Sequence, residues 1–305
     1  MEKVIVVIGP TSVGKTKMGV ALAKKFNGEV ISGDSMQIYK QMDIGTAKVT
    51  EEEKEGIIHH CVDILNSDET YSVHDFQQTV RKKITEITQR GHVPIIVGGT
   101  GLYVDSLIYG IEYPNIEFDE NYRKELERRV EKEGLEKLYE KAKKIDPQAM
   151  KKISRNDQKR ILRVLEIYNA TGKTKTEQEI ESRKNEVKYD YRVFAINMDR
   201  EKLYERINIR VDRMLENGLI EEVENLQKKY NHFPTAMQGL GYKEVVEYLQ
   251  SQITREEMIE KIKQESRRYA KRQLTWFRKN KQTIWIDGLA NLKDNINIIE
   301  KELNK

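Results

Sequence analysis

The residues from Gly9 to Thr16 read GPTSVGKT and combine a glycine-bearing turn with a lysine and a hydroxyl group. This spacing fits G-x-x-x-x-G-K-[ST], a loop whose backbone N–H groups surround phosphate groups. The context also fits, because an apolar run precedes the loop and a helical pattern follows it. Lys15 then supplies a positive charge, and the Thr16 hydroxyl ligates a Mg²⁺ that bridges two phosphates. The loop predicts phosphate binding but leaves open whether the phosphates are hydrolysed, transferred or expelled.

Two further stretches place polar side chains directly after predicted strands. Asp34 follows the apolar run 29–33, and Thr100 follows the run 93–99. Ligands of parallel sheets bind at the carboxyl ends of the strands, so both side chains are expected to face the phosphate loop. Asp34 suits a general base or a Mg²⁺-positioning group, and equally the N-cap of a helix. The run 93–99 ends without the aspartate that motor-type ATPases use to hold their metal, which argues against that class but not against a small-molecule kinase.

Short apolar runs that read as parallel strands recur along the chain, at 4–9, 29–33, 93–99, 191–197 and 283–287. Such continuous runs are typical of strands buried on both faces. Helical patterns separate them, so the sequence predicts an α/β fold in which a parallel sheet carries the phosphate loop (P-loop) and is flanked by helices. Between 113 and 190 the pattern is charged, amphipathic helix. We therefore expect a catalytic core, 1–112 with 191–305, and an all-helical insertion domain, 113–190.

Composition excludes several classes of protein. Of the 305 residues, 34% are charged, the mean hydropathy is −0.73, and no apolar run is long enough to cross a membrane. Cys61 is the single cysteine, which excludes an internal disulfide and a multi-cysteine zinc site and is typical of a cytoplasmic protein. His59 and His60 are adjacent, and on a strand they would point to opposite faces, so a structural role is favoured over a shared metal ion.

Basic residues concentrate in two segments. Residues 151–175 carry a net charge of +6 and residues 261–281 a net charge of +8. From charge alone, each segment is either a solvated helix face or a footprint for a phosphate backbone. The aromatic residues Tyr269, Trp276 and Phe277 fall on one broad helical face and are predicted to belong to the core.

Several of these stretches together resemble one family. They are GPTSVGKT, DSMQIYKQMDIGTAK, VPIIVGGTGLY, NDQKRILRVLEIYNATGK and YAKRQLTWFR, and they run in order along nearly the whole chain. They look like the tRNA dimethylallyltransferases, also called tRNA isopentenyltransferases, of the bacterial type. The resemblance implies transfer of a dimethylallyl group from dimethylallyl diphosphate to N6 of the adenosine 3′ of the anticodon in tRNA, with Mg²⁺. The diphosphate is then expelled as the leaving group.

The resemblance also implies residue roles. Asp34 is the general base, Thr100 lies near the reaction centre, and Lys15 with an arginine meets the diphosphate. Arg206 and Arg210 both suit that arginine, and we favour Arg210. The diphosphate is held by Gly9, Pro10, Thr11, Ser12, Val13, Gly14, Lys15 and Thr16. The anticodon stem-loop is contacted by Asp34, Ser35, Met36, Gln37, Thr100, Arg123, Gln158, Lys159, Arg160, Ile161 and Leu162.

Other readings of the sequence remain. A P-loop small-molecule kinase explains the phosphate loop and Asp34, but it does not require two basic helical segments. An adenylate isopentenyltransferase, acting on AMP or ATP, shares the chemistry without an RNA surface. A non-catalytic RNA-binding protein does not explain the intact Lys15 and Thr16 beside Asp34. We expect a monomer without a membrane association or a stable protein partner.

Overall fold

The computed structural model describes residues 1–113, 119–184 and 186–305. The chain forms two compact units, one made of residues 1–108 with 188–305 and the other of residues 109–187. The sequence placed this division at 113 and 190, so the two descriptions differ by a few residues at each boundary. Residues 114–118 and 185 of the expected insertion lie outside the described residues.

The larger unit is built on one six-stranded sheet in the order β3-β2-β4-β1-β5-β6. All of its strand pairs are parallel. The strands are β1 (Lys3–Ile8), β2 (Gly28–Ser32), β3 (His59–His60), β4 (Val93–Gly98), β5 (Asp190–Asn197) and β6 (Ile284–Asp287). The five apolar runs of the sequence correspond to strands, and the α/β class with a parallel sheet is confirmed. The sequence did not predict strand β3, because it consists of two histidines and therefore lacks an apolar run.

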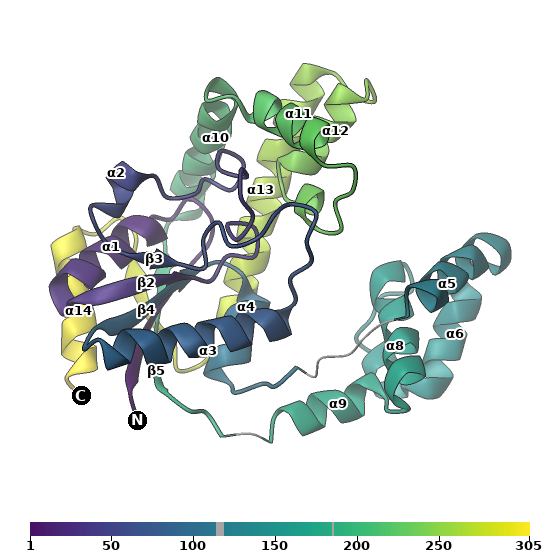
Figure 1. The fold of residues 1–305 in the computed structure, drawn as a ribbon, viewed down its shortest axis with the longest axis horizontal. Helices are drawn as coiled ribbons and strands as arrows, with labels where there is room; N and C mark the ends of the chain where they lie inside the picture. The colour runs from purple at the N-terminus through teal and green to yellow at the C-terminus, as the bar shows by residue number, and fades with distance from the viewer. Residues whose placement is uncertain (114–118, 185) are drawn as a thin grey trace. The chain divides into compact units, whose positions relative to one another are not determined.

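Successive side chains of the strands supply two separate cores. In β1, Ile5 and Val7 face one side, where α1 (Lys15–Phe26) and α14 (Leu292–Leu303) pack. Val4, Val6 and Ile8 face the other side, against α3 (Val73–Gln89) and α4 (Gly101–Ile108). The same helices cover the two faces of the sheet in Figure 1. The period of two along a strand thus explains why the runs are apolar throughout.

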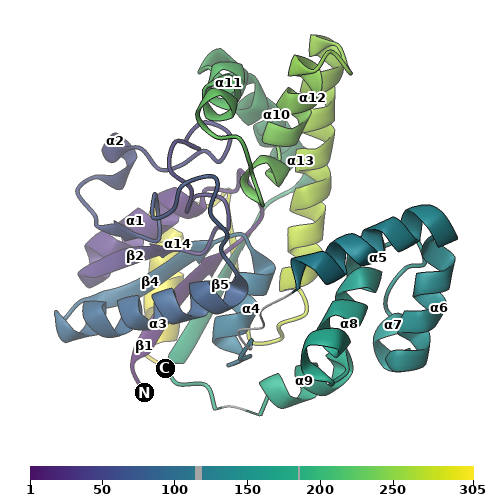
Figure 2. The ribbon, with the colours of Figure 1, turned by 45° about the vertical axis from the view of Figure 1, so that its right-hand side comes forward.

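A group of helices from the last third of the chain gathers beyond one end of the sheet, as both Figure 1 and Figure 2 show. It consists of α10 (Arg200–Glu216), α11 (Leu219–Lys229), the short helix Ala236–Gln238, α12 (Tyr242–Leu249) and α13 (Arg255–Phe277). Its core includes Ile38, Tyr39 and Met42 from the segment that follows β2. The short helix α2 (Glu51–Lys54) lies later in that segment. Among the described helices, none has the length and apolarity needed to cross a membrane.

The smaller unit is helical where it is described. Its helices are α5 (Glu120–Glu133), α6 (Leu135–Ile145), α7 (Pro147–Met150), α8 (Gln158–Thr171) and α9 (Lys175–Ser182). Leu126, Leu138, Ile161 and Leu165 meet in a core of its own. The buried carboxylate of Asp146 accepts the N–H of Ala149 and both the N–H and the hydroxyl of Thr176. This side chain therefore caps α7 and ties the start of α9 to it.

A buried carboxylate at the start of β2 joins three segments of the larger unit. Glu29 is 2% exposed and accepts hydrogen bonds from Arg90, with Nη2 at 2.7 Å. Nε2 of His60 and Nδ1 of His92 lie 2.6 and 2.7 Å from its oxygens. Burial acts to raise the pKa of Glu29, but the hydrogen bonds to Arg90, His60 and His92 outweigh it and lower the pKa to about 2. The adjacent histidines thus serve structure, with His59 bonding the Ile57 carbonyl.

We expect Glu29→Gln to lower the free energy of unfolding by about 2 kcal/mol at pH 7, because its partners lose a charged acceptor. The pKa of Glu29 is depressed in the folded state, so its contribution is present above the ordinary glutamate pKa and is lost as pH falls toward 2. Urea unfolding at pH 7, 5 and 3 should show the difference from wild type shrinking below pH 5. The exposed Glu51→Gln serves as the control, and a difference that does not change with pH would contradict the assignment.

Candidate active site

The P-loop connects β1 to α1 at the carboxyl end of the sheet. Its backbone passes through positive φ at Ser12 (65°) and Gly14 (99°), a turn that makes successive N–H groups converge on an anion. Gly14 is also the N-cap of α1 and offers no side-chain acceptor to the first turn. The free N–H groups and the positive end of the helix dipole therefore face the space where a phosphate group would lie.

Lys15 lies near one other cation, Arg210, and one anion, Asp34. Its ammonium group donates a hydrogen bond to the Pro10 carbonyl at 2.8 Å. Burial, together with charge repulsion from Arg210, lowers the pKa of Lys15 to about 8, while the Asp34 carboxylate opposes this shift. The structure thus brings Lys15, Arg210 and Asp34 close enough to influence one another, although they come from three distant segments.

Asp34 begins the segment between β2 and α2. Its Oδ1 accepts the backbone N–H of Met36 at 2.9 Å, which forms a local turn. The N–H of Ser35, which lies between Asp34 and Met36, donates to the Thr100 hydroxyl at 3.1 Å. Thr100 thus connects the loop after β4 to the loop after β2, as their shared sheet edge predicts. No helix begins at Asp34, so the N-cap alternative is wrong.

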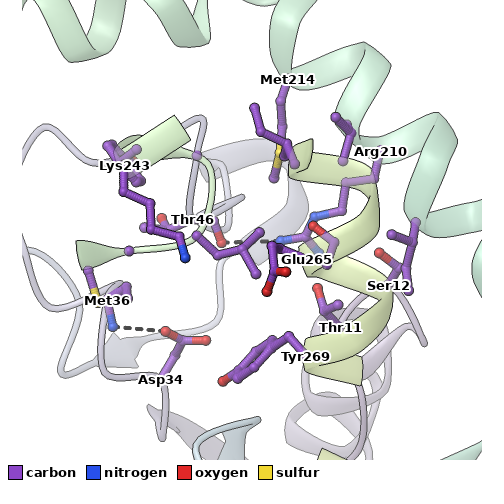
Figure 3. Close-up of a pocket in the computed structure, with 18 of the residues that line it drawn as sticks. Thr11, Ser12, Asp34, Met36, Thr46, Arg210, Met214, Lys243, Glu265 and Tyr269 are labelled. Carbon is purple, nitrogen blue, oxygen red and sulfur yellow. Dashed lines mark hydrogen bonds between the residues drawn. The ribbon is translucent and has the colours of Figure 1, made fainter. Parts of the chain in front are cut away.

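The P-loop and the segment after β2 border a cavity of about 300 Å³ in the larger unit, and Thr100 lies outside its lining. Figure 3 shows Asp34, Arg210 and Tyr269 directed toward the same space. Part of the wall is polar and contains Thr11, Ser12, Asp34 and Arg210. An apolar part is formed by Met36, Ile207, Val211, Met214, Leu240 and Ile262. The arrangement can accept a ligand that is anionic at one end and apolar at the other.

Arg210 reaches the cavity from α10. Its Nη2 donates to the Thr46 carbonyl at 3.3 Å, and burial lowers its pKa while Asp34 opposes this shift. Arg206, one turn earlier on the same helix, is exposed and lies outside the cavity lining. The structure therefore separates the two arginines that the sequence left open.

Helix α13 contributes residues that sequence reasoning assigned elsewhere. Phe277 is buried in the core as predicted, and Trp276 donates its Nε1–H to Asp105. Tyr269 instead lines the cavity, where burial, with the Asp34 charge as a further cause, raises its pKa to about 12. Glu265 and Arg272 of the same helix, and Lys243 of α12, also line the cavity, and the sequence did not predict them. The broad aromatic face of the helix was a signal, but periodicity does not reveal what a face meets.

Gln273 of α13 joins the P-loop to the loop after β4. Its Oε1 accepts the N–H of Thr11, and its Nε2 donates to the Gly99 carbonyl. A Cβ on Gly99 would lie 2.4 Å from that Nε2 atom. This close approach explains why a glycine follows β4 here.

The candidate tRNA-contacting residues of the smaller unit fall into two groups. Gln158, Lys159 and Arg160 are exposed at the start of α8. Ile161 and Leu162 are both 0% exposed in the core of this unit. The apolar face of α8 turns inward, so the side chains of these two residues do not face an external RNA, and a contact to them would have to use the backbone.

Arg123 is tied to its own unit by ion pairs. Its Nε donates to Glu127 at 2.8 Å and its Nη1 to the buried Glu166 at 3.2 Å. Arg163 lies on the other side of that carboxylate, with Nη1 3.8 Å from Oε2 of Glu166. Within the basic segment 151–175, Lys173 pairs with Glu181 and Lys175 with Glu179, two acids outside that segment, so part of its net charge is balanced within the unit.

Comparison with known proteins agrees with this geometry. The family model described as IPP transferase matches residues 37–280. Proteins named tRNA dimethylallyltransferase are 49% identical in Bacillus cereus (strain AH187) and 48% identical in Bacillus anthracis. Each match spans 286 residues, which cover 94% of this chain and 90% and 91% of those proteins, respectively.

Solved structures show the same fold. A full-length tRNA isopentenylpyrophosphate transferase from Bacillus halodurans is 44% identical, with a TM-score of 0.75 over 100% of this chain and 96% of that one. A eukaryotic dimethylallyltransferase acting on tRNA is 34% identical, with a TM-score of 0.77 over 94% of this chain and 74% of that one. On the family match and these identities, the chain belongs to the IPP transferase family.

Proposed function

We propose that this protein transfers a dimethylallyl group from dimethylallyl diphosphate to N6 of the adenosine 3′ of the anticodon in tRNA. The main support is a single cavity that is lined by the P-loop, by Arg210, by the Asp34 carboxylate and by apolar side chains. The relatives that match nearly the whole chain are named for this activity. The products are N6-isopentenyladenosine and diphosphate.

The diphosphate end of the donor fits the P-loop side of the cavity. Breaking the C–O bond places negative charge on the diphosphate oxygens. In this proposal the N–H groups of the loop, Lys15 and Arg210 meet that charge and stabilise it as it develops. The phosphates are thus neither hydrolysed nor transferred, and the P-loop binds the diphosphate as the leaving group.

The five-carbon group fits the apolar part of the wall. Met36, Ile207 and Met214 come from the segment after β2 and from α10. Burial of the allyl carbons there excludes water from the reacting carbon, which favours transfer to the amine over hydrolysis. A cavity of about 300 Å³ has the size expected for a small ligand.

Asp34 is proposed as the general base. The exocyclic amine of adenine is a weak nucleophile because its lone pair is delocalised into the ring. A carboxylate that takes the amine proton as the new C–N bond forms relieves this weakness. The hydrogen bond from the Met36 N–H holds one carboxylate oxygen of Asp34 in place. The adenosine must leave its stack to reach the cavity.

Mg²⁺ fits the oxygen donors that are present. The Thr16 hydroxyl stands one residue after Lys15 at the start of α1. Among the described residues no group of three His, Cys, Asp or Glu side chains could hold a metal ion. Mg²⁺ keeps several water ligands and shares the remainder with substrate phosphates, so Thr16 and the diphosphate oxygens would suffice. When bound, the ion neutralises charge on the leaving group.

Binding of the anticodon stem-loop is proposed for both units. Asp34, Ser35, Met36, Gln37 and Thr100 would meet the nucleotide that enters the cavity. Gln158, Lys159 and Arg160 would contact the backbone of the RNA, and Arg123 would support them. We also propose that the protein is a monomer and that it acts in the cytoplasm.

The first test is the choice of acceptor. Labelled dimethylallyl diphosphate should label bulk tRNA and leave AMP and ATP unlabelled. Asp34→Ala should lower turnover by about 10²-fold while tRNA affinity stays within a few-fold, because proton removal is lost and binding is not.

The exposed Asp68→Asn is the matched control and should behave as wild type. Labelling of AMP or ATP instead of tRNA would favour the adenylate prenyltransferase, and phosphoryl transfer from ATP would favour the kinase. Full turnover by Asp34→Ala at saturating substrates would remove Asp34 from its proposed role.

The second test uses the pKa of Lys15. The protonated ammonium binds the diphosphate, and in the free enzyme it titrates near pH 8. The kcat/KM for dimethylallyl diphosphate reports the free enzyme. It should therefore fall as pH rises through about 8, by up to about tenfold per pH unit. Lys15→Arg should remove this decline, since arginine stays charged at these pH values. A wild-type profile that is flat from pH 7 to 9.5 would contradict this role for Lys15.

The third test concerns the start of α8. Replacing Lys159 and Arg160 by Ala should weaken binding of all tRNAs and lower the slope of log K against log salt by up to about 0.9 per lost phosphate contact. The turnover of bound tRNA should change little. A variant with Lys293 and Lys301 replaced by Ala removes the same charge from α14 and should keep the wild-type slope. Equal slopes in both variants would place the RNA surface elsewhere, with the basic segment 261–281 the next to test.

A further inference from the structure

The carboxylate of Glu222, on α11, accepts hydrogen bonds from three consecutive backbone N–H groups in the segment after β2. Its Oε2 accepts the N–H groups of Asp43 and Ile44 at 2.9 and 2.8 Å, and its Oε1 accepts the N–H of Gly45 at 3.1 Å. Three consecutive N–H groups that converge in this way form an anion-binding concavity. Here the anion is a side chain of the protein, contributed by a helix about 180 residues later in the sequence.

Tyr242 of α12 completes the arrangement. Its hydroxyl donates to Oε1 of Glu222 at 2.6 Å. Tyr242 is 0% exposed, and burial, followed by the charge of Glu222, raises its pKa far above the ordinary value, so it remains a donor. A Cβ on Gly45 would lie 2.5 Å from the Tyr242 ring. The glycine, the ring and the carboxylate therefore interlock, and we call these three residues the Glu222 latch.

Gly45 of the latch is followed directly by Thr46, which contacts the active-site residue Arg210. The carbonyl of Thr46 accepts the hydrogen bond from Nη2 of Arg210. The side-chain amide of Gln37, which is bonded through its carbonyl to the Ser32 hydroxyl, lies within 3.5 Å of the same Thr46 oxygen. The peptide that orients Arg210 is thus held on one side by the latch.

The far side of the segment has a separate anchor. Lys48 is 9% exposed and donates to the Tyr39 carbonyl at 2.9 Å and to Asp63 at 2.6 Å, and it also pairs with Asp43. With Lys48 on one side and the latch on the other, Thr46 has little freedom to move. The direction of Arg210 into the cavity depends on that carbonyl.

We propose that Glu222, supported by Tyr242, is a positioning residue that fixes the Thr46 carbonyl and through it the Arg210 guanidinium. Glu222 touches no substrate and acts only through Arg210. The effect on turnover rests on the proposed function, because Arg210 acts there on the leaving diphosphate. The effect on the segment itself does not, because the hydrogen bonds exist without substrate.

Hydrogen exchange tests the structural part without substrate. Glu222→Gln removes the charge at nearly constant shape, and the amides of residues 43–45 should exchange at least tenfold faster while the sheet keeps its protection. The neighbouring, exposed Glu221→Gln is the matched control and should match wild type. Unchanged exchange at 43–45 in Glu222→Gln would overturn the latch even if the enzyme proves to have another activity.

A double-mutant cycle tests the positioning role. Glu222→Gln should lower kcat/KM for dimethylallyl diphosphate by about 10–10²-fold, the scale of a misplaced catalytic group, with tRNA affinity within a few-fold. On an Arg210→Ala background the same change should cost less than threefold, because both changes remove one interaction. Losses that multiply would show that Glu222 acts independently of Arg210, and they would overturn the proposal.

Tyr242→Phe is the second variant, to be used if Glu222→Gln folds poorly. It retains the ring beside Gly45 and removes only the hydroxyl, so a loss of about threefold to tenfold is expected, again suppressed on the Arg210→Ala background. Wild-type activity in Tyr242→Phe, with wild-type exchange at 43–45, would also count against the latch. Absence of prenyl transfer by the wild-type protein would overturn the proposed function alone, since the exchange experiment judges the latch separately.

Discussion

Lys15 and Arg210, two cations that repel each other, lie near the Asp34 carboxylate. Burial and, after it, the repulsion from Arg210 lower the pKa of Lys15. A pair of cations is complementary to an anion, so a bound diphosphate would offset the repulsion between Lys15 and Arg210. Preorganised charge of this kind stabilises a leaving group without rearrangement during the reaction. The surrounding structure must therefore hold Lys15 and Arg210 in place before any ligand arrives.

The helices beyond the sheet provide most of that support. The P-loop, the loop after β4 and the segment after β2 each have a hydrogen-bond partner from this group of helices. Gln273 bonds the P-loop and the loop after β4, and Glu222 gathers the N–H groups of the segment after β2. The parallel sheet brings the loop ends together, while later helices determine their conformations. A catalytic site with supports from so many segments should lose activity through changes at residues that never touch substrate.

The helical unit places exposed basic side chains next to fully buried apolar ones within one helix. The first turn of α8 exposes Lys159 and Arg160, and the next residues, Ile161 and Leu162, are fully buried. Arg123 is paired with the buried Glu166, so it has a structural partner in the absence of RNA. The net positive charge of residues 151–175 also overstates the charge available to a phosphate backbone, because Lys173 and Lys175 pair with Glu181 and Glu179, which lie outside that segment.

The sequence by itself determined the parallel α/β sheet, the P-loop and the position of Asp34 at the sheet edge. These features depend on short-range patterns, namely apolar runs and the spacing of glycine, lysine and threonine. It did not separate Arg210 from Arg206, because both lie on α10 and only its packing decides which one enters the cavity. It also missed Tyr269 and Glu222, since helical periodicity defines a face but not the segment that meets it. Those contacts join residues far apart in the chain, and only the tertiary structure could decide them.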